Sequence, residues 1–373
     1  SPVRPMEDGF GGVGGGGCGG LGGSDMAERK MSTAVVGVGL AGAVVASKLT
    51  EAGCRVEAWD KGRGPGGRCS TRRSGGAGEG LAFDHGAQYL TANEPRFVAM
   101  VEGWASAGVV AEWGADGLVE VDALVGGDGG FEVVGVAPVK RRWVGVPGMS
   151  RIVSRELEGV GVGFERRVVG LARGDGGWSL AMEGGEVVGP YERVVLGMPA
   201  VQARGLLELV EQGLAERLAL VEVTPCWAAM LVVEGGAGLE WVGAKVRGHE
   251  ALSWVANDSS KPGRARDDGL ECWVVHASPA WTLANLEIGR ESAGERLAEA
   301  FGDLCEGLGV GRPGYAKVRA HRWLYAQTQT ALGEPYLVNG DGTLWVCGDW
   351  MLGGKLEAAA LSGLATAEAV LGG

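Results

Sequence analysis

The sequence predicts an α/β fold in which a domain with a parallel sheet is interleaved with a second domain of mixed or antiparallel sheet and helices. Three observations support this class. An apolar run at 34–38 leads into a glycine-rich turn, the middle of the chain alternates like antiparallel strands, and a second apolar strand at 344–347 ends in Gly348-Asp349. A chain of 373 residues suits two domains or one large interrupted domain.

The first element is a buried parallel strand at 34–38. Gly37, Gly39 and Gly42 then give the spacing G-x-G-x-x-G, in which the glycines allow a tight turn, a close approach of a pyrophosphate, and close packing of helix on strand. A helix at 41–52 would point its N-terminus at the phosphates. The turn therefore predicts a Rossmann-like dinucleotide site.

The second strand is expected at 55–60, with Asp60 at its carboxyl end, eighteen residues after Gly42. A carboxylate at this distance is placed to bind ribose hydroxyls. It argues for an unphosphorylated ribose, although the adjacent Lys61 and Arg63 leave a 2′-phosphate open.

Further elements follow from hydrophobic spacing. We expect helices at 95–107, 150–158, 201–221, 288–308 and 356–370. We expect strands at 160–171, 178–182, 186–190, 193–196, 271–278, 318–325 and 344–347, with several strands within 226–256 and further short strands within 109–145.

The C-terminal strand carries a second cofactor signal. Gly348-Asp349 follows the strand at 344–347, and a helix rich in small residues comes next. FAD needs such a second set of contacts because its ribityl chain and isoalloxazine ring reach far beyond the first phosphate loop. Gly66-Gly67-Arg68 also extends the first motif. Arg68 is expected to meet the FAD pyrophosphate, with a surface salt bridge as the alternative.

Composition excludes several classes of partner and cofactor. The net charge of −12 and the isoelectric point of about 5.0 disfavour nucleic acid and anionic membranes, and no apolar run is long enough to span a bilayer. The seven scattered cysteines indicate reduced thiols in an intracellular compartment. The four histidines lack ligand spacing, so we expect no metal site.

Glycine dominates residues 9–23, so we expect residues 1–30 to be a disordered tail, with the remnant of a targeting segment as one interpretation. We therefore expect a cytoplasmic protein, or an organellar one if residues 1–30 are such a remnant. We assign 31–98, 145–205 and 331–373 to the cofactor domain, and 99–144 and 206–330 to the substrate domain.

Several segments together resemble the renalase family, within the wider group of amine-oxidase-like flavoproteins. They are Asp60-Lys61 with Gly66-Gly67-Arg68, Asp84 with Gly86-Ala87-Gln88-Tyr89, 142–150, Ser260-Lys261-Pro262-Gly263-Arg264, Ala320-His321-Arg322-Trp323-Leu324-Tyr325-Ala326, and Val346-Cys347-Gly348-Asp349-Trp350. The resemblance covers nearly all of residues 31–373. It departs at Ala358, where the family usually has glycine, and at Cys69, where it usually has methionine.

The resemblance implies a non-covalent FAD. It also implies oxidation of the 2- and 6-dihydro isomers of NAD(P)H to NAD(P)+ by hydride transfer to flavin N5, with dioxygen then reduced to hydrogen peroxide. The partners expected are thus a dihydronicotinamide substrate and dioxygen, while the oligomeric state stays open.

Two sets of site residues follow. The expected cofactor-binding residues are Gly37, Gly39, Ala41, Gly42, Asp60, Lys61, Gly67, Arg68, Gln88, Tyr89, Gly348, Asp349 and Leu361. The expected catalytic residues are Gln88, Tyr89, His276, His321, Trp323 and Tyr325, because aromatic walls suit a flat ring that becomes cationic, and histidines can orient a carboxamide or a phosphate. Trp281 is a further aromatic candidate, and core packing is the alternative for each aromatic and histidine.

Two other functions stay open at this point. The same fold can serve an amine oxidase with an aromatic cage for a neutral amine. A non-catalytic flavin-binding protein is the second alternative.

Overall fold

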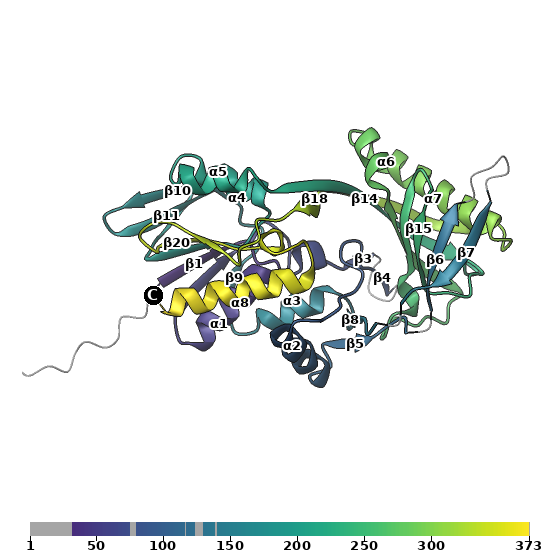
Figure 1. Ribbon diagram of the computed structural model, residues 1–373, viewed down its shortest axis with the longest axis horizontal. Helices are drawn as coiled ribbons and strands as arrows, with labels where there is room; N and C mark the ends of the chain where they lie inside the picture. Colours follow the sequence, from purple (N-terminus) through teal and green to yellow (C-terminus); the bar gives the residue numbers. More distant parts are fainter. Residues whose placement is uncertain (1–31, 75–79, 116, 124–129, 139, 373) are drawn as a thin grey trace, which may run out of the picture. The chain divides into compact units, whose positions relative to one another are not determined.

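A computed structural model of the chain describes residues 32–74, 80–115, 117–123, 130–138 and 140–372 (Figure 1). The glycine-rich tail predicted at 1–30 lies outside the described residues. Within the described part, no helix combines the length and hydropathy that crossing a bilayer requires. The six cysteines described there are free thiols.

The first large sheet has six strands in the order β19-β20-β13-β1-β2-β9. All neighbouring strands run parallel except β19, which pairs antiparallel with β20. The bounds are β1 (Ser32–Val36), β2 (Arg55–Trp59), β9 (Gly161–Gly163), β13 (Arg193–Leu196), β19 (Leu337–Val338) and β20 (Leu344–Val346). Since carboxyl ends of parallel strands share one edge, the loops after β1, β2, β13 and β20 meet there.

Alternate residues of β1 pack into two different hydrophobic cores, one on each face of the sheet. Val35 packs under the helices α1 (Leu40–Glu51), α2 (Pro95–Ser106), α3 (Ser150–Glu156) and α8 (Leu356–Gly372), some of which Figure 1 shows together below the sheet. Ala34 and Val36 face a second layer. That layer is the antiparallel sheet β10 (Val168–Gly174), β11 (Gly177–Met182) and β12 (Val187–Tyr191), with α4 (Ala200–Leu207) and α5 (Gln212–Leu218).

Helices α1 and α8 pack closely because α8 has a glycine at the contact. A Cβ at Gly363 would lie 2.5 Å from the carbonyl oxygen of Ala41. The predicted cofactor helix α1 is therefore held by the C-terminal helix, and Gly348 and Asp349 are brought back beside the first glycine turn.

The second large sheet has seven strands in the order β18-β14-β17-β16-β15-β6-β7. Helices α6 (Pro279–Ala284) and α7 (Arg290–Gly307) cover one face, and the short hairpin β3 (Arg72–Ser74) and β4 (Leu81–Phe83) contributes to the core on the other. The bounds are β6 (Leu118–Ala123), β7 (Phe131–Val136), β14 (Glu222–Glu234), β15 (Gly243–Arg247), β16 (Leu252–Asn257), β17 (Leu270–Ala277) and β18 (Gly314–Thr330); β5 (Val110–Glu112) pairs with β8 (Trp143–Gly145).

The predicted fold class is confirmed, and three element predictions need correction. The single strand expected at 160–171 is two strands, β9 parallel to β2 and β10 antiparallel to β11, separated by a turn in which Glu165 has φ 55°. The helix expected at 201–221 is broken into α4 and α5. Strand β18 is far longer than 318–325, because β14 pairs with it from Glu234 back to Glu222.

The strands of the first sheet come from 31–98, 145–205 and 331–373, and those of the second from 99–144 and 206–330. The division into domains at those boundaries stays a prediction.

A buried cluster of four charges ties distant segments together. Lys261 Nζ lies 3.1 Å from Asp84 Oδ2 and 2.7 Å from Asp258 Oδ1, and Arg264 pairs with both carboxylates. None of these side chains is more than 5% exposed. Asp84 also accepts hydrogen bonds from Thr71 Oγ1 at 2.7 Å and from the N–H of Met149 at 3.0 Å.

The cluster is satisfied as a unit. Burial alone would raise the pKa of Asp84, but the charges of Lys261 and Arg264 hold that pKa below its ordinary value of 3.8. Removing one member leaves an opposite charge buried without compensation, which is strongly destabilising.

We therefore expect Asp84→Asn to lower the free energy of unfolding by about 3–5 kcal/mol. Urea unfolding measures this loss. The matched control is Glu183→Gln, which removes an acid from the exposed pair with Arg167 (3.4 Å) and should cost less than about 1 kcal/mol. Equal losses in the two variants would contradict a structural role for the cluster.

Candidate functional site

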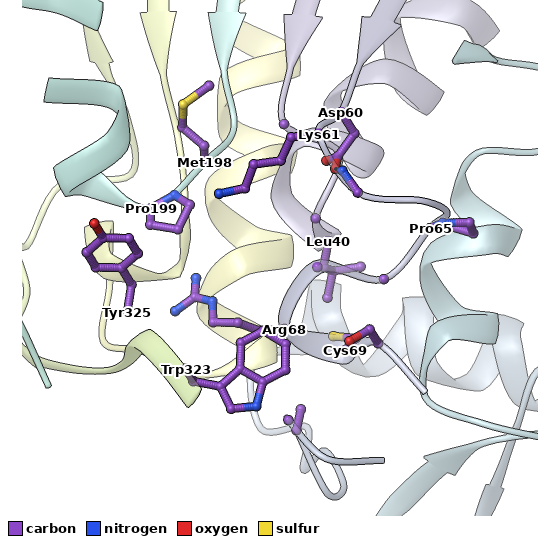
Figure 2. Close-up of a pocket in the computed structure, with 18 of the residues that line it drawn as sticks. Leu40, Asp60, Lys61, Pro65, Arg68, Cys69, Met198, Pro199, Trp323 and Tyr325 are labelled. Carbon is purple, nitrogen blue, oxygen red and sulfur yellow. Dashed lines mark hydrogen bonds between the residues drawn. The ribbon is translucent and has the colours of Figure 1, made fainter. Parts of the chain in front are cut away.

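A cavity of about 1410 Å³ opens at the carboxyl edge of the first sheet and extends to β18. It exceeds the roughly 300–1,000 Å³ of common ligand sites, so it has room for more than one small ligand. Its wall comes from the turn after β1, the segment 59–73, residues 85–87, the turn after β13, β18 and residues 348–359. Figure 2 shows part of this wall.

The glycine turn forms as its spacing predicts. Gly37 has φ 87°, which disfavours a side chain, and a Cβ at Gly42 would lie 2.0 Å from the carbonyl oxygen of Gly37. A Cβ at Gly39 would meet nothing within 4 Å, so the backbone of Gly39 faces open space in the cavity wall. Gly67 lies beside Gly39, where a Cβ on Gly67 would be 3.2 Å from Gly39 Cα. The turn is a surface that a pyrophosphate can approach closely.

Asp60, the carboxylate predicted to bind ribose, accepts hydrogen bonds from the backbone of the glycine turn and of its own loop. Asp60 Oδ2 accepts the N–H of Val38 at 2.8 Å, and Asp60 Oδ1 accepts the N–H of Gly62 at 2.6 Å. Each carboxylate oxygen has a second acceptor position, so hydroxyl groups can still be bound. Beside it, burial and the charge of Arg167 lower the pKa of Lys61, and Figure 2 shows this side chain pointing toward Met198 and Pro199.

Arg68 and Asp349 meet, although 281 positions separate them in the chain. Arg68 Nη1 donates to Asp349 Oδ2 at 2.9 Å, and Arg68 Nη2 pairs with Oδ1. The Asp349 side chain is 7% exposed and that of Arg68 30%. The pair therefore fixes a guanidinium on the cavity wall with further donors available, since only two of its five N–H groups are used.

Aromatic and imidazole rings gather at the β18 end of the cavity. The rings of His321 and Trp323 are 4.4 Å apart between centroids, and His85 lies 5.0 Å from each. Trp323 Nε1 donates to the His85 carbonyl at 2.9 Å, and His276 Nε2 donates to the same oxygen at 3.2 Å. In Figure 2 the Trp323 ring lies beside Arg68, with Tyr325 near Pro199.

The three imidazoles are neutral at physiological pH. Burial lowers the pKa of His276 to about 4, and burial with the charges of Arg72 and Arg290 lowers that of His321 to about 4. Burial, and then the proximity of His321 and Arg72, lowers the pKa of His85 to about 3.

Most of the predicted site residues line this cavity, and four do not. Those on its wall are Gly37, Gly39, Ala41, Asp60, Lys61, Gly67, Arg68, His276, His321, Trp323, Tyr325, Gly348 and Asp349. Gly42 lies beneath the turn, and Leu361 packs against the core formed by the helices.

Gln88 and Tyr89, predicted for both catalysis and cofactor binding, are also away from the cavity wall. Gln88 is bound in the buried charge cluster, where its amide donates to the Asp84 carbonyl and accepts from Lys261 at 3.4 Å. Tyr89 packs among Trp113 and Trp254. Trp281, the further aromatic candidate, is in the core of the second sheet.

Sequence reasoning missed His85 and Arg72 as wall residues. His85 stands between Asp84 and Gly86, which are both quoted for the resemblance, so its position was a usable signal. Arg72 lies on a three-residue strand that no hydrophobic pattern marks. The roles predicted for individual residues stay predictions.

The residues present fit FAD. An open glycine turn, a carboxylate behind it and a fixed guanidinium follow one another along the wall, and the cavity continues to the ring-lined end at β18. Cys69, which departs from the resemblance, is compatible, because burial raises the pKa of its thiol to about 12 and keeps it neutral.

Comparison with known proteins gives the family. Residues 35–104 match the NAD(P)-binding Rossmann-like domain, and residues 130–371 match the flavin containing amine oxidoreductases. The second match covers more than half of the chain.

Solved structures share the fold at low sequence identity. A protein assigned as a protoporphyrinogen oxidase from Exiguobacterium has a TM-score of 0.71 at 11% identity, and cyclohexylamine oxidase from Brevibacterium oxydans has 0.69 at 11%; each comparison covers 92% of this chain and 99% of the other. Putrescine oxidase bound to putrescine has 0.66 at 12%, with the same coverage. The chain belongs to the flavin-containing amine oxidoreductases, and its cofactor is FAD.

Proposed function

We propose that this protein is a renalase-like oxidase of the 2- and 6-dihydro isomers of NAD(P)H. One dihydronicotinamide, one proton and one dioxygen give NAD(P)+ and hydrogen peroxide, with FAD held without a covalent bond. The charge of the cavity is the observation that carries the proposal.

The cavity is basic in an acidic protein. Among the described residues ten basic side chains line it, against the two acids Asp60 and Asp349. Four of the ten, Arg151, Arg166, Arg167 and Arg322, pair with glutamates outside the wall, which leaves the excess of positive charge to the other six. Both acids are already bound, one to backbone N–H groups and one to Arg68. The chain has a net charge of −12, so this local excess of positive charge favours anionic ligands such as nucleotides and disfavours ammonium ions.

The ring-lined end of the cavity suits a dihydropyridine. Loss of a hydride makes that ring aromatic and cationic, so the reaction needs positioning more than acid–base catalysis. Trp323 and Tyr325 offer aromatic surfaces to the ring, and neutral His276 and His321 do not repel the developing positive charge. When bound, FAD supplies the acceptor for the two electrons.

An amine oxidase is the second candidate. The family and two structural neighbours, cyclohexylamine oxidase and putrescine oxidase bound to putrescine, favour it. Trp323 and Tyr325 would then form the walls for a neutral amine.

Anaerobic mixing separates the two candidates. We expect the 2- and 6-dihydro isomers to bleach the absorbance of the oxidised flavin quickly, because the cavity binds an anionic nucleotide. Putrescine and cyclohexylamine should bleach it far more slowly or not at all. Stopped-flow absorbance measures each rate, and ordinary 4-dihydroNADH serves as the matched nucleotide control.

Bleaching by the amines alone would replace the proposal with the amine oxidase. Bleaching by none of the compounds would leave a flavin-binding protein without either activity.

Arg68 gives a test of cofactor binding. Arg68→Met should raise the dissociation constant of FAD about tenfold or more, because the charge-assisted bond that we expect between Arg68 and a phosphate is lost and Asp349 loses its counterion. Flavin fluorescence after dialysis measures the released fraction. Lys48→Met, which breaks an exposed pair on α1, is the control, and it should retain FAD like the wild type.

The neutral histidines predict a pH dependence of stability. Their pKa values of about 3 to 4 lie below the ordinary 6.5, so the unfolded chain binds protons that the folded chain does not. The free energy of unfolding should therefore fall as pH falls from about 6.5 to about 4, by up to about 1.4 kcal/mol per pH unit for each histidine. Urea unfolding across this range measures the slope. A His276→Asn variant should have a shallower slope; an unchanged slope would refute the assignment.

A further inference from the structure

Arg72 on β3 lies at the edge of the main cavity. It lines that cavity, and it also packs beside Lys317, Arg319 and apolar residues of β4 and β14 around a small depression that has no room for a water molecule. Its Nε atom is buried without a hydrogen-bond partner in the described part of the chain. A buried donor of a charged group is costly when unpaired, which points to an anion that comes from a ligand.

Other arginines surround it. Burial, and then the charges of Arg63, Arg319 and Arg290, lower the pKa of Arg72. Within the described residues, Arg72, Arg290 and Arg319 form no ion pair and no side-chain hydrogen bond. The chain has 46 acidic residues, yet none of those in the described ranges pairs with these three arginines. Such convergence of like charge is unfavourable unless an anion binds there.

Strand β18 connects this cluster to the ring-lined end of the cavity. Lys317, Arg319, His321 and Trp323 alternate along one face of the strand, whereas Val318 and Ala320 pack into the core on the other face. The Cα atoms of alternate residues in a strand are roughly 6.6 Å apart, so the Cα atoms of Trp323 and Arg319 are about 13 Å apart. A nucleotide whose ring lies near Trp323 can therefore extend its phosphate toward Arg319 and Arg72.

We propose that Arg72, with the charges of Arg319, Lys317 and Arg290 nearby, forms an anion subsite on the cavity wall for a phosphate group of the substrate. The subsite rests on the proposed function and deepens it, since it selects phosphorylated nicotinamide nucleotides over the free ring, the riboside and amines. A planar guanidinium can donate two parallel hydrogen bonds to two phosphate oxygens, whereas an ammonium group acts as a point charge. Phe83, Met230 and Val232 give the aliphatic stem of Arg72 an apolar floor.

A matched pair of ligands tests the subsite. Nicotinamide mononucleotide and nicotinamide riboside differ only in the phosphate, and calorimetry measures the binding of each to the FAD-loaded protein. We expect the wild type to bind the mononucleotide about tenfold or more tightly than the riboside. Arg72→Gln and Arg319→Gln should each reduce that preference several-fold while leaving riboside affinity unchanged.

Arg173→Gln is the control variant. It removes one positive charge at an exposed pair with Asp341, outside the cavity wall, and should keep the full preference. If Arg72→Gln does not fold, Arg72→Lys keeps the charge, loses the paired geometry, and should show an intermediate preference.

The outcomes separate the two proposals. Equal affinity of the wild type for both ligands, or an equal loss of preference in Arg173→Gln, overturns the anion subsite. A phosphate preference that depends on Arg72 and Arg319 supports the subsite, even if no dihydro isomer bleaches the flavin; in that case only the oxidase proposal fails.

Discussion

The buried charges of Asp84, Asp258, Lys261 and Arg264 constrain much of the molecule. Their partners come from the segment after β2, the start of α3 and the turn after β16, so segments far apart in sequence must meet for any one charge to be satisfied. Removing any one of the four charges would leave an opposite charge buried without its full compensation. His85 follows Asp84 directly, so the same cluster sets the position of the wall between the glycine turn and β18.

The cavity shows how a rigid scaffold can hold like charges together. Arg68 has an internal counterion in Asp349, whereas Arg72, only four positions further along, has none in the described residues. The two arginines therefore differ in what a ligand gains from them. An anion near Arg68 would share the guanidinium with a carboxylate, whereas an anion near Arg72 would relieve repulsion among arginines.

The glycine turn and Asp60 could be predicted from the sequence because their conformations depend on neighbouring residues in the chain. The turn at Gly37 requires a positive φ, and Asp60 follows a strand of predictable length, so spacing alone locates both. The positions of Gln88 and Tyr89 could not be predicted in the same way, because they depend on Lys261 and Trp254 from a distant segment. Nor could the pairing of Arg68 with Asp349, which depends on how α8 packs against α1. The length of β18 was underestimated because its ends carry polar residues, and pairing with β14 outweighs their weak strand pattern.

Strand β18 separates what the protein binds from what keeps it folded. One side of its pleat meets α7, and the other carries basic, imidazole and aromatic side chains in succession. Because the two sets alternate, relatives of this protein can acquire a ligand of different length or charge by exchanging every second residue. The loss of a single residue, in contrast, would exchange the two faces. The face of this strand that lines the cavity can therefore change in composition, whereas a change in the length of the strand would move residues out of the core.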